Sequence, residues 1–459
     1  MTVRGLGWER GGRPRRRTVG RRLRRGVAIG LAAVLCATGL AACADDGEGP
    51  VVTVLGSWTG AEADAFAEVV APFERDTGID VRYEGTRDVD AVLAARVDAD
   101  NPPDLAALSS PGDLIGYART DRLKPLDSVP GIADNDRAYA ADWATLGEVD
   151  GVRVAVVVKA ALKSLIWYNP ETLAAHNLRP PATWAELTDT AEGLAAAGIQ
   201  PWCLGLASSS TSGWPGTDWI EDIVLARSGP AVYDRWTNGE LAWTAPEIRA
   251  AWETWGELLA IGRTGSGENA TEQAGPADPM AALLTGYDQA GKGLFASPPG
   301  CGLEHQASFA ANWYRTAAAG TGFNFTAFPV FAEPEAMPRT GVPAREVGGD
   351  VMAMFDDTPQ ARQLITYLAG AEAQTLWVRA GSLSPNRNVP LTAYASDPVT
   401  QKIGRSLAEA EVIRFDASDR MPGPMRGAFH RAVLAFTANP ANLDAILADL
   451  EQARLAAYS

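Results

Sequence analysis

Tryptophans in polar, glycine-rich stretches are the residues of this chain best suited to contact a ligand. Trp58, Trp214 and Trp219 lie in such stretches, which we interpret as loops, and the last two share residues 213–219 with Asp218. An indole ring offers a flat face to the apolar C–H surface of a pyranose, and a carboxylate accepts two hydroxyl hydrogen bonds at once. We therefore expect these residues to bind a sugar. The alternative for each tryptophan is a half-buried structural position.

Patterns that would indicate catalysis are absent from the sequence. There is no Gly-x-Ser-x-Gly elbow, no Walker A string and no usable Gly-x-Gly-x-x-Gly. The histidines, His176, His305 and His430, are dispersed without the spacing of metal ligands. We predict that the protein is not an enzyme and holds no metal or cofactor. A secreted glycoside hydrolase is the enzymatic alternative, because two carboxylates beside aromatic rings would also suit sugar hydrolysis.

The first residues have the layout of an export signal. Ten arginines precede an apolar run at 27–40, and small residues follow directly before Cys43. This order indicates a secretory signal peptide over 1–42, and a cysteine after the cleavage point resembles the lipobox of bacterial lipoproteins. We expect Cys43 to be lipidated and 43–50 to tether the protein to the outer side of the cell membrane. A transmembrane anchor is the alternative, but the run is shorter than the roughly 20 residues that a bilayer core requires.

Charge and cysteine usage narrow the partners and the compartment. The leader carries ten arginines against Glu9, so the formal net charge of −16 becomes −25 for residues 43–459, which opposes nucleic acid binding. Outside Cys36 and Cys43, the chain has only Cys203 and Cys301. In an oxidising compartment we expect these two to form a disulfide, with two separate buried thiols as the alternative.

Apolar patterns predict an α/β fold. Strands are expected at 51–55, 79–83 and 105–108, separated by helices with apolar residues at helical spacing, and this alternation is typical of βαβ units. Ligands of such sheets lie at the carboxyl ends of the strands, which brings 56–60 and 109–111 together. Later strands are expected at 152–158 and 165–169, with 159–164 crossing between lobes. Trp252 and Trp255 are three residues apart in a helical pattern, so we expect both in the core. A helix is expected to begin at 180–184, and 262–279 is expected to be a loop.

Several strings resemble those of a known family. Ser57-Trp58-Thr59-Gly60, Asn101-Pro102-Pro103-Asp104-Leu105 and Trp167-Tyr168-Asn169 occur in the order used by extracellular solute-binding proteins of sugar ABC transporters. Residues 213–222 and 415–422 resemble the α-glucoside-binding group of that family, which is like maltose-binding protein. The resemblance covers nearly all of 51–455.

This resemblance implies a two-lobed periplasmic-binding-protein-like fold of type II that closes around a di- or oligosaccharide. Lobe one would comprise 51–159 plus 326–370, and lobe two 160–325 plus 371–459. The implied partners are a carbohydrate and the membrane permease of an ABC importer, and we expect a monomer. A polyol, a phosphosugar or a peptide is the alternative ligand, although a chain with five lysines is poorly suited to phosphate.

Candidate ligand-binding residues come from the loop tryptophans, from the resemblance strings and from the ends of strands. They are Trp58, Glu62, Asp104, Ser109, Trp214, Asp218, Trp219, Phe309, Asp350, Arg387 and Asp419. For three of them a structural role is the alternative: Asp104 would cap its own turn, Asp419 would hold its loop, and Arg387 would form a salt bridge.

Overall fold

The computed structural model describes residues 49–139, 141–262, 279–318, 320–329, 331, 344–394, 397–410 and 412–459. All of them belong to one compact unit, Glu48–Ser459. The predicted signal peptide, Cys43, most of the tether and most of the predicted loop at 262–279 lie outside the described residues. Among the described helices, none is both long and apolar enough to cross a membrane.

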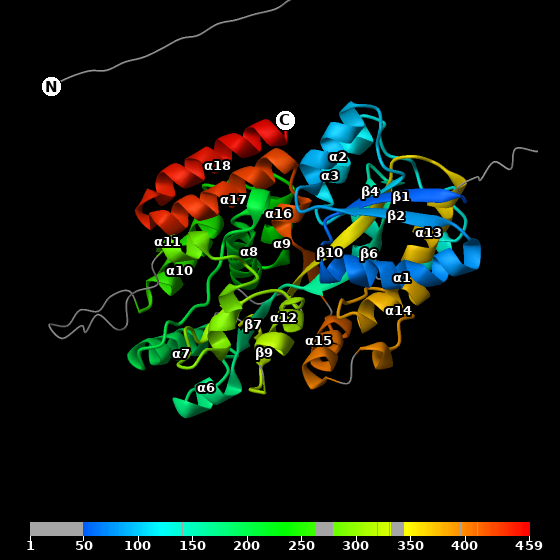
Figure 1. The fold of residues 1–459 in the computed structure, drawn as a ribbon. Helices are drawn as coiled ribbons and strands as arrows, with labels where there is room; N and C mark the ends of the chain where they lie inside the picture. Colours follow the sequence, from blue (N-terminus) through cyan, green and yellow to red (C-terminus); the bar gives the residue numbers. More distant parts are fainter. Residues whose placement is uncertain are drawn as a thin grey trace, which may run out of the picture. The chain divides into compact units, whose positions relative to one another are not determined.

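A six-stranded mixed sheet forms the core of one half of the fold (Figure 1). Its strands are β1 (Val51–Gly56), β2 (Asp80–Gly85), β3 (Leu105–Leu108), β6 (Ala155–Leu162), β10 (Arg345–Met354) and β11 (Ile413–Phe415). β1 runs parallel to both β2 and β3, whereas β10 pairs antiparallel with β3 and β6 and parallel with β11. The sequence therefore predicted the three N-terminal strands and their parallel pairing correctly, and 56–60 follows β1 beside the end of β3.

Helices cover both faces of this sheet. α1 (Ala61–Thr77) buries its predicted apolar side chains in one cluster with Val52 and Val54, and α2 (Val89–Asp98) buries its own against Leu55. Because side chains alternate along a strand, the two clusters lie on opposite faces. On the α1 side, α13 (Pro359–Ala369) packs on β1 and β6, and α14 (Ala371–Arg379) packs on α1. β1 is apolar on both faces because both are covered.

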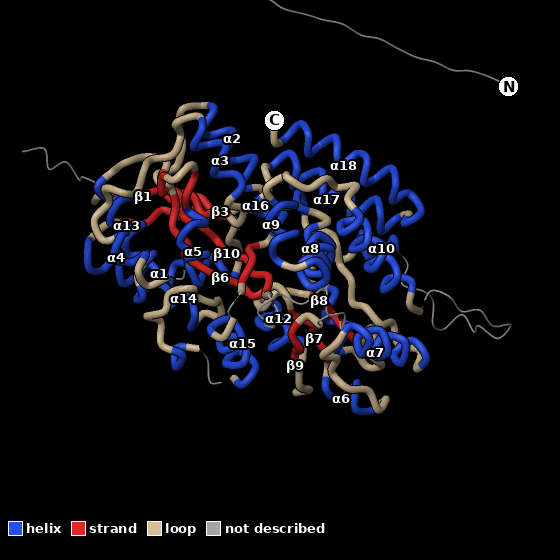
Figure 2. The backbone as a smooth tube through the Cα atoms, turned by 180° about the vertical axis from the view of Figure 1, so that it is seen from behind, coloured by secondary structure: helices blue, strands red, loops and turns tan. Residues whose placement is uncertain are grey.

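The second half of the fold contains a three-stranded antiparallel sheet of β7 (Leu165–Tyr168), β8 (Leu303–His305) and β9 (Asn324–Ala327). Its main helices are α8 (Trp214–Ser228), α10 (Pro246–Ala260), α17 (Gly423–Ala438) and α18 (Leu443–Ala457). α8 packs on α10 and α17, and α17 on α18 (Figures 1 and 2). Trp252 and Trp255 are fully buried there, as the helical spacing predicted.

The remaining elements are short connectors and surface helices. The helices are α3 (Gly112–Arg119), α4 (Ile132–Asp136), α5 (Ala141–Ala144), α6 (Pro170–Ala175), α7 (Trp184–Ala196), α9 (Pro230–Thr237), α11 (Pro279–Leu284), α12 (Ala310–Ala317), α15 (Pro398–Ala408) and α16 (Ala417–Arg420). Single turns of 3₁₀ helix are η1 (Thr145–Gly147), η2 (Ser209–Thr211), η3 (Ala290–Phe295), η4 (Leu391–Ala393) and η5 (Pro440–Asn442), and β4 (Glu148–Val149) pairs with β5 (Val152–Arg153). α7 starts where predicted, with a capping box between Thr183 and Glu186.

Two local expectations were wrong. Residues 214–219 are not a loop but the first turns of α8. The strand expected at 152–158 is split, and its main part, β6, continues to Leu162, so Lys159 lies within a strand and only Lys163 and Ser164 separate β6 from β7. Glycine and proline at 213–216 suggested a loop, but Gly213 is the N-cap of α8 and Pro215 lies in its first turn. Lys159 can lie within β6 because Asp350 pairs with it.

The predicted disulfide is present. Cys203 and Cys301 are bonded, with their Cα atoms 5.3 Å apart and 98 residues apart in sequence. The bond joins the segment after α7 to the segment before β8, and it supports the neighbouring bridge between Trp202 and Leu303.

Candidate functional site

Four aromatic side chains from separate segments form one cluster, which we call the aromatic quartet: Trp214, Tyr287, Phe309 and Trp313. The ring centroids of Trp214 and Tyr287 lie 5.2 Å apart, and those of Tyr287 and Trp313 lie 5.5 Å apart. Phe309 completes the cluster, 5.4 Å from Trp313 and 6.1 Å from Trp214. All four side chains are only partly buried, so the quartet keeps apolar ring surface that a ligand can cover.

The sequence before Trp214 explains its position. Gly213 has φ 109°, and an added Cβ would lie 2.4 Å from the carbonyl oxygen of His430, so only glycine fits. Pro215 then favours the first turn of a helix, because its fixed φ matches the helix and the amide hydrogen it lacks is not needed there. These two residues place the indole at the start of α8.

Beside the quartet lies a group of charged side chains, which we call the Lys159 cluster: Lys159, Asp350, Glu62 and Arg87. The register of β6 and β10 sets Lys159 opposite Asp350, and its Nζ lies 3.0 Å from Asp350 Oδ2 and 3.0 Å from Glu62 Oε1. Arg87 Nη2 lies 3.0 Å from Glu62 Oε2. Burial opposes the charged form of Lys159, but Asp350 and Glu62 raise its pKa above the usual value, so the lysine stays cationic.

Tyr287 of the quartet interacts electrostatically with Arg87 of this cluster. Burial would lower the pKa of Arg87, but Tyr287 in its ionised form and the Glu62 carboxylate raise it above its usual value. Conversely, burial raises the pKa of Tyr287, and Arg87 lowers it. Such mutual effects require proximity, so partly exposed aromatic surface and hydrogen-bonding groups meet in one region.

Trp58 supports the Lys159 cluster from within the core. Its indole is 1% exposed, Nε1 donates to Asp350 Oδ2 at 2.8 Å, and Lys159 Nζ lies 5.2 Å from its ring centroid. The ring packs between Tyr83, Phe66 and the α14 residue Trp377. The structure therefore brings Trp58 next to Glu62 and Asp350, as a buried neighbour rather than an exposed face.

A second lysine forms the Lys163 cluster, with Asp218 and Asp416. Lys163 Nζ donates to both carboxylate oxygens of Asp218, at 3.1 and 3.0 Å, and to Asp416 Oδ2 at 2.7 Å. The same nitrogen lies 4.9 Å from the centroid of the Trp214 ring. Burial opposes the charge, yet the two aspartates raise the pKa of Lys163 well above its usual value. Asp218 is 1% exposed, so Lys163 connects a buried carboxylate with the Trp214 ring of the quartet.

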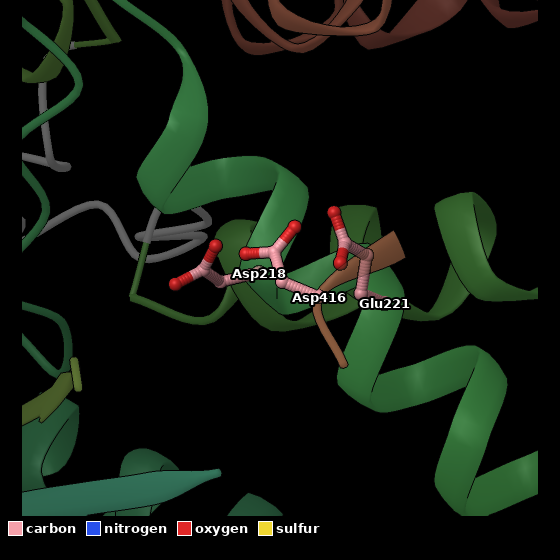
Figure 3. Close-up of side chains that lie close together, drawn as sticks. All are labelled: Asp218, Glu221 and Asp416. Carbon is pink, nitrogen blue, oxygen red and sulfur yellow. The ribbon is translucent and has the colours of Figure 1, made fainter. Parts of the chain in front are cut away.

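Asp218, Asp416 and Glu221 bring carboxylate oxygens within 4.8 Å of one another, a spacing that a metal ion could use (Figure 3). Their side chains point toward one another from α8 and from the residue after β11. However, Lys163 already bonds to both aspartates, and Glu221 accepts the backbone N–H groups of Ala417 and Ser418 at 2.6 and 3.2 Å. Protein donors thus engage all three carboxylates, and the absence of a metal stays a prediction.

The other predicted residues have diverse surroundings. Ser110, next to the partly buried Ser109, donates to Asp419 Oδ1 at 2.8 Å, which links the end of β3 to α16. Burial and the charge of Asp416 raise the pKa of Asp419 to about 7. Asp104 accepts from Thr53 and Thr358 inside the sheet.

Trp219 and Arg387 lie apart from the quartet's contacts. Trp219 is 3% exposed and packs against Trp202 and His305, with centroids 5.0 and 4.5 Å away. Arg387 is exposed, and its backbone N–H donates to Ala138. No contact among the described residues links either side chain to the quartet or to the two lysine clusters.

Sequence reasoning missed Arg87, Lys159, Lys163, Tyr287 and Trp313. A signal existed for the lysines, because two of the five in the chain stand four residues apart in an apolar stretch of sequence, where an unpaired charge is costly. Such a pair predicts buried acidic partners. Tyr287 and Trp313 lie in unremarkable surroundings, and only the fold brings them beside Trp214.

Comparison with known proteins identifies relatives along most of the chain. Residues 58–375 match the model of the bacterial extracellular solute-binding protein family. The osmoprotective compounds-binding protein GgtB of Synechocystis sp. is 36% identical over 81% of this chain and 85% of its own. The alpha-glucosides-binding periplasmic protein AglE of Rhizobium meliloti is 32% identical over 87% of this chain and 86% of its own.

A solved structure matches the fold. The bacterial solute receptor AcbH, reported to prefer β-D-galactopyranose exclusively, superimposes with a TM-score of 0.74. Its sequence is 17% identical, and the match covers 90% of this chain and 100% of that one. The α/β architecture predicted from the sequence is thus the type II fold of periplasmic sugar-binding proteins.

Proposed function

Because the chain belongs to the bacterial extracellular solute-binding protein family, we propose that it is the binding component of a carbohydrate ABC importer. It captures a neutral di- or oligosaccharide, an α-glucoside in the first instance, and delivers it to the membrane permease. The relative AglE, whose name specifies α-glucosides, supports this ligand. The protein performs no chemistry on the sugar.

The observation that best supports a neutral ligand is that each cation described beside the quartet is paired with a carboxylate. Arg87 lies against Glu62, and Lys159 lies against Glu62 and Asp350. Lys163 bonds to Asp218 and Asp416. An anionic phosphosugar would have to displace a carboxylate from one of these cations, whereas a neutral sugar can add hydroxyl hydrogen bonds to pairs that stay intact.

Within this site the groups have different tasks. The partly exposed rings of Trp214, Tyr287 and Phe309 stack on sugar faces, and Glu62 and Arg87, which are partly exposed, bond to hydroxyls. Asp350 and Lys159 are nearly buried and set the positions of those groups. Asp419 and Ser109 remain candidate ligand-binding residues. They lie where the hydrogen bond from Ser110 to Asp419 joins the end of β3 to α16.

Binding proceeds by closure of two lobes, as a hinge motion that the ligand stabilises by contacting both. Lobe one is built on the large sheet and lobe two on the sheet of β7, β8 and β9. Packing of α14 on α1 supports moving 371–379 into lobe one, and pairing of β9 with β7 supports moving 326–327 into lobe two. The end of β6 at 160–162 and β11 at 413–415 belong to the large sheet, which supports moving them into lobe one as well. The remaining boundaries stay as proposed from the sequence.

We propose further that export removes 1–42 and that acylated Cys43 anchors the protein on the outer side of the cell membrane. The lipobox-like sequence supports this anchor, and one or two acyl chains hold a protein at a membrane without spanning it.

A small polyhydroxylated osmoprotectant is the second candidate ligand. The identity of 36% to the osmoprotective compounds-binding protein GgtB favours it. Such a ligand would use the Lys159 cluster in the same way but would cover less of the quartet.

Differential scanning fluorimetry followed by titration calorimetry tests the function. The panel comprises maltose, trehalose, sucrose, maltotriose, a polyol and glucose 6-phosphate. A ligand specific to the folded state raises the melting temperature by mass action. We expect a neutral α-glucoside to bind most tightly. Tightest binding of the polyol would select the second candidate, and binding of the phosphosugar alone would refute the neutral site.

A further inference from the structure

The buried lysine beneath the aromatic quartet is placed to control the ring that meets the ligand. Lys163 follows β6, and its side chain is 9% exposed. Its ammonium bonds to Asp218 on α8 and Asp416 after β11, and it also lies 4.9 Å from the centre of the Trp214 ring. One cation thus contacts two fixed carboxylates and the indole that starts α8.

We infer that Lys163 is a positioning residue for ligand stacking: it holds the Trp214 indole through a cation–π contact, and Asp218 and Asp416 hold the lysine. This inference rests on the proposed function and assigns Asp218 a task different from ligand binding. Both oxygens of Asp218 accept from Lys163, and the residue is almost fully buried. Its carboxylate therefore acts on the ligand through Lys163 and Trp214.

The physical reason is that Gly213 and Pro215 fix where α8 begins but do not by themselves fix the tilt of the Trp214 ring. It is the first residue of α8, and its ring is partly exposed, with edge-on contacts to Tyr287 and Phe309. The desolvated ammonium adds a contact over the face of the ring, and it favours the tilt that centres the ring on the ammonium.

The lysine is itself tightly held. It has two carboxylate partners, and the wall beside its stem is Gly348 of β10, where an added Cβ would lie 2.9 Å from Lys163 Cε. Glycine at this position therefore leaves the room that the stem needs. Glu346 lies two residues earlier on the same strand and on the same side, and burial raises the pKa of its carboxyl well above the usual value.

Two variants perturb Lys163 in different ways. Lys163→Met combined with Asp218→Asn removes the cation and one carboxylate, so the net charge of the cluster is unchanged, and Asp416 keeps the donors Ser418 and Asp419. Gly348→Ala keeps the cation and displaces its stem. As matched controls, Lys402→Met removes a lysine 4.1 Å over the ring of Phe325, and Gly116→Ala adds a Cβ in open space.

The first measurement needs no ligand. The protein is labelled with 5-fluorotryptophan, and the ¹⁹F resonance of Trp214 is assigned with Trp214→Phe. We expect this resonance to shift and broaden in both Lys163-directed variants while the other tryptophan resonances and the circular dichroism stay unchanged. The two controls should leave it in place. A Trp214 resonance identical to wild type in folded Gly348→Ala or in the double variant would overturn the inference, whether or not a sugar is found.

The second measurement is a double-mutant cycle on affinity for the sugar identified above. We expect Lys163→Met/Asp218→Asn to weaken binding about fivefold to thirtyfold, and Gly348→Ala to weaken it less. In a Trp214→Ala background neither change should weaken binding further, because the lysine acts through that ring. Equal losses in both backgrounds would show a general structural effect and refute the positioning role. A wild type that binds no sugar would refute the proposed function instead, and the resonance would still decide the inference.

Discussion

Glu304 should make the stability of the folded unit fall as the pH rises. This β8 residue is 2% exposed, and burial raises the pKa of its carboxyl from 4.5 to about 8 despite hydrogen bonds from Tyr314 and from the backbone of Gly291. The folded protein therefore keeps the proton at pH 7, whereas the unfolded chain releases it.

The sign and size follow from linkage. A carboxyl with a raised folded-state pKa contributes its full stability below the unfolded pKa of 4.5 and loses it as the pH rises to about 8. Each pH unit in this window lowers the free energy of unfolding by about 1.4 kcal/mol, so the total between pH 4.5 and about 8 is about 5 kcal/mol.

Glu304→Gln replaces the titratable carboxyl by a neutral amide of nearly the same shape. We expect the stability of the variant, minus that of wild type, to increase steadily between pH 5 and pH 8. Urea denaturation followed by circular dichroism at four pH values measures this difference. The control Glu68→Gln, at an exposed position on α1, should give a difference independent of pH. If the Glu304→Gln difference is equally flat, the carboxyl ionises inside the folded protein and the reasoning fails.

Further predictions concern the site and the covalent framework. Trp214→Ala should weaken sugar binding by about one to two decades in calorimetry, as expected for loss of an aromatic anchor. Trp219→Ala should lower the melting temperature, while the protein that remains folded keeps nearly its full affinity for the sugar. Replacing Cys203 and Cys301 by serine should reduce the free energy of unfolding by about 4 kcal/mol in urea, because the bond closes a loop of about a hundred residues; an unchanged urea midpoint would contradict this. Mass spectrometry of membrane-extracted protein should find an acylated N-terminal Cys43, and an uncleaved leader would disprove the anchor.

The sheet and its first helices were predictable because their signals are local. Phe66, Val69, Val70 and Phe73 repeat at helical spacing, and Gly78 ends α1 in a left-handed conformation, as a helix-terminating glycine does. The disulfide was predictable because only two cysteines lie outside the predicted signal peptide and the predicted lipidation site. Nothing in these inferences requires knowledge of distant contacts.

The site was predictable only in part, because burial is decided by distant segments. Trp58 and Trp214 look alike in sequence, each within two residues of a glycine, yet Trp58 is enclosed by Phe66 and Trp377, whereas Trp214 stays partly exposed. Asp218 was expected to hold a ligand, because the sequence does not reveal that Lys163, 55 residues earlier, meets it.

Lys159 in β6 and Lys163 directly after it explain how one segment can position the side chains of the site proposed for a neutral ligand. Lys159 and Lys163 lie four residues apart, and both draw carboxylates from other elements: Asp350 and Glu62 for the first, Asp218 and Asp416 for the second. Each lysine also lies within about 5 Å of a tryptophan ring. Paired charges cost less to bury than single ones and fix their neighbours in direction as well as distance. A site built in this way offers preset donors, acceptors and ring faces without net attraction for an anion, which is the requirement for selecting an uncharged polyhydroxylated ligand.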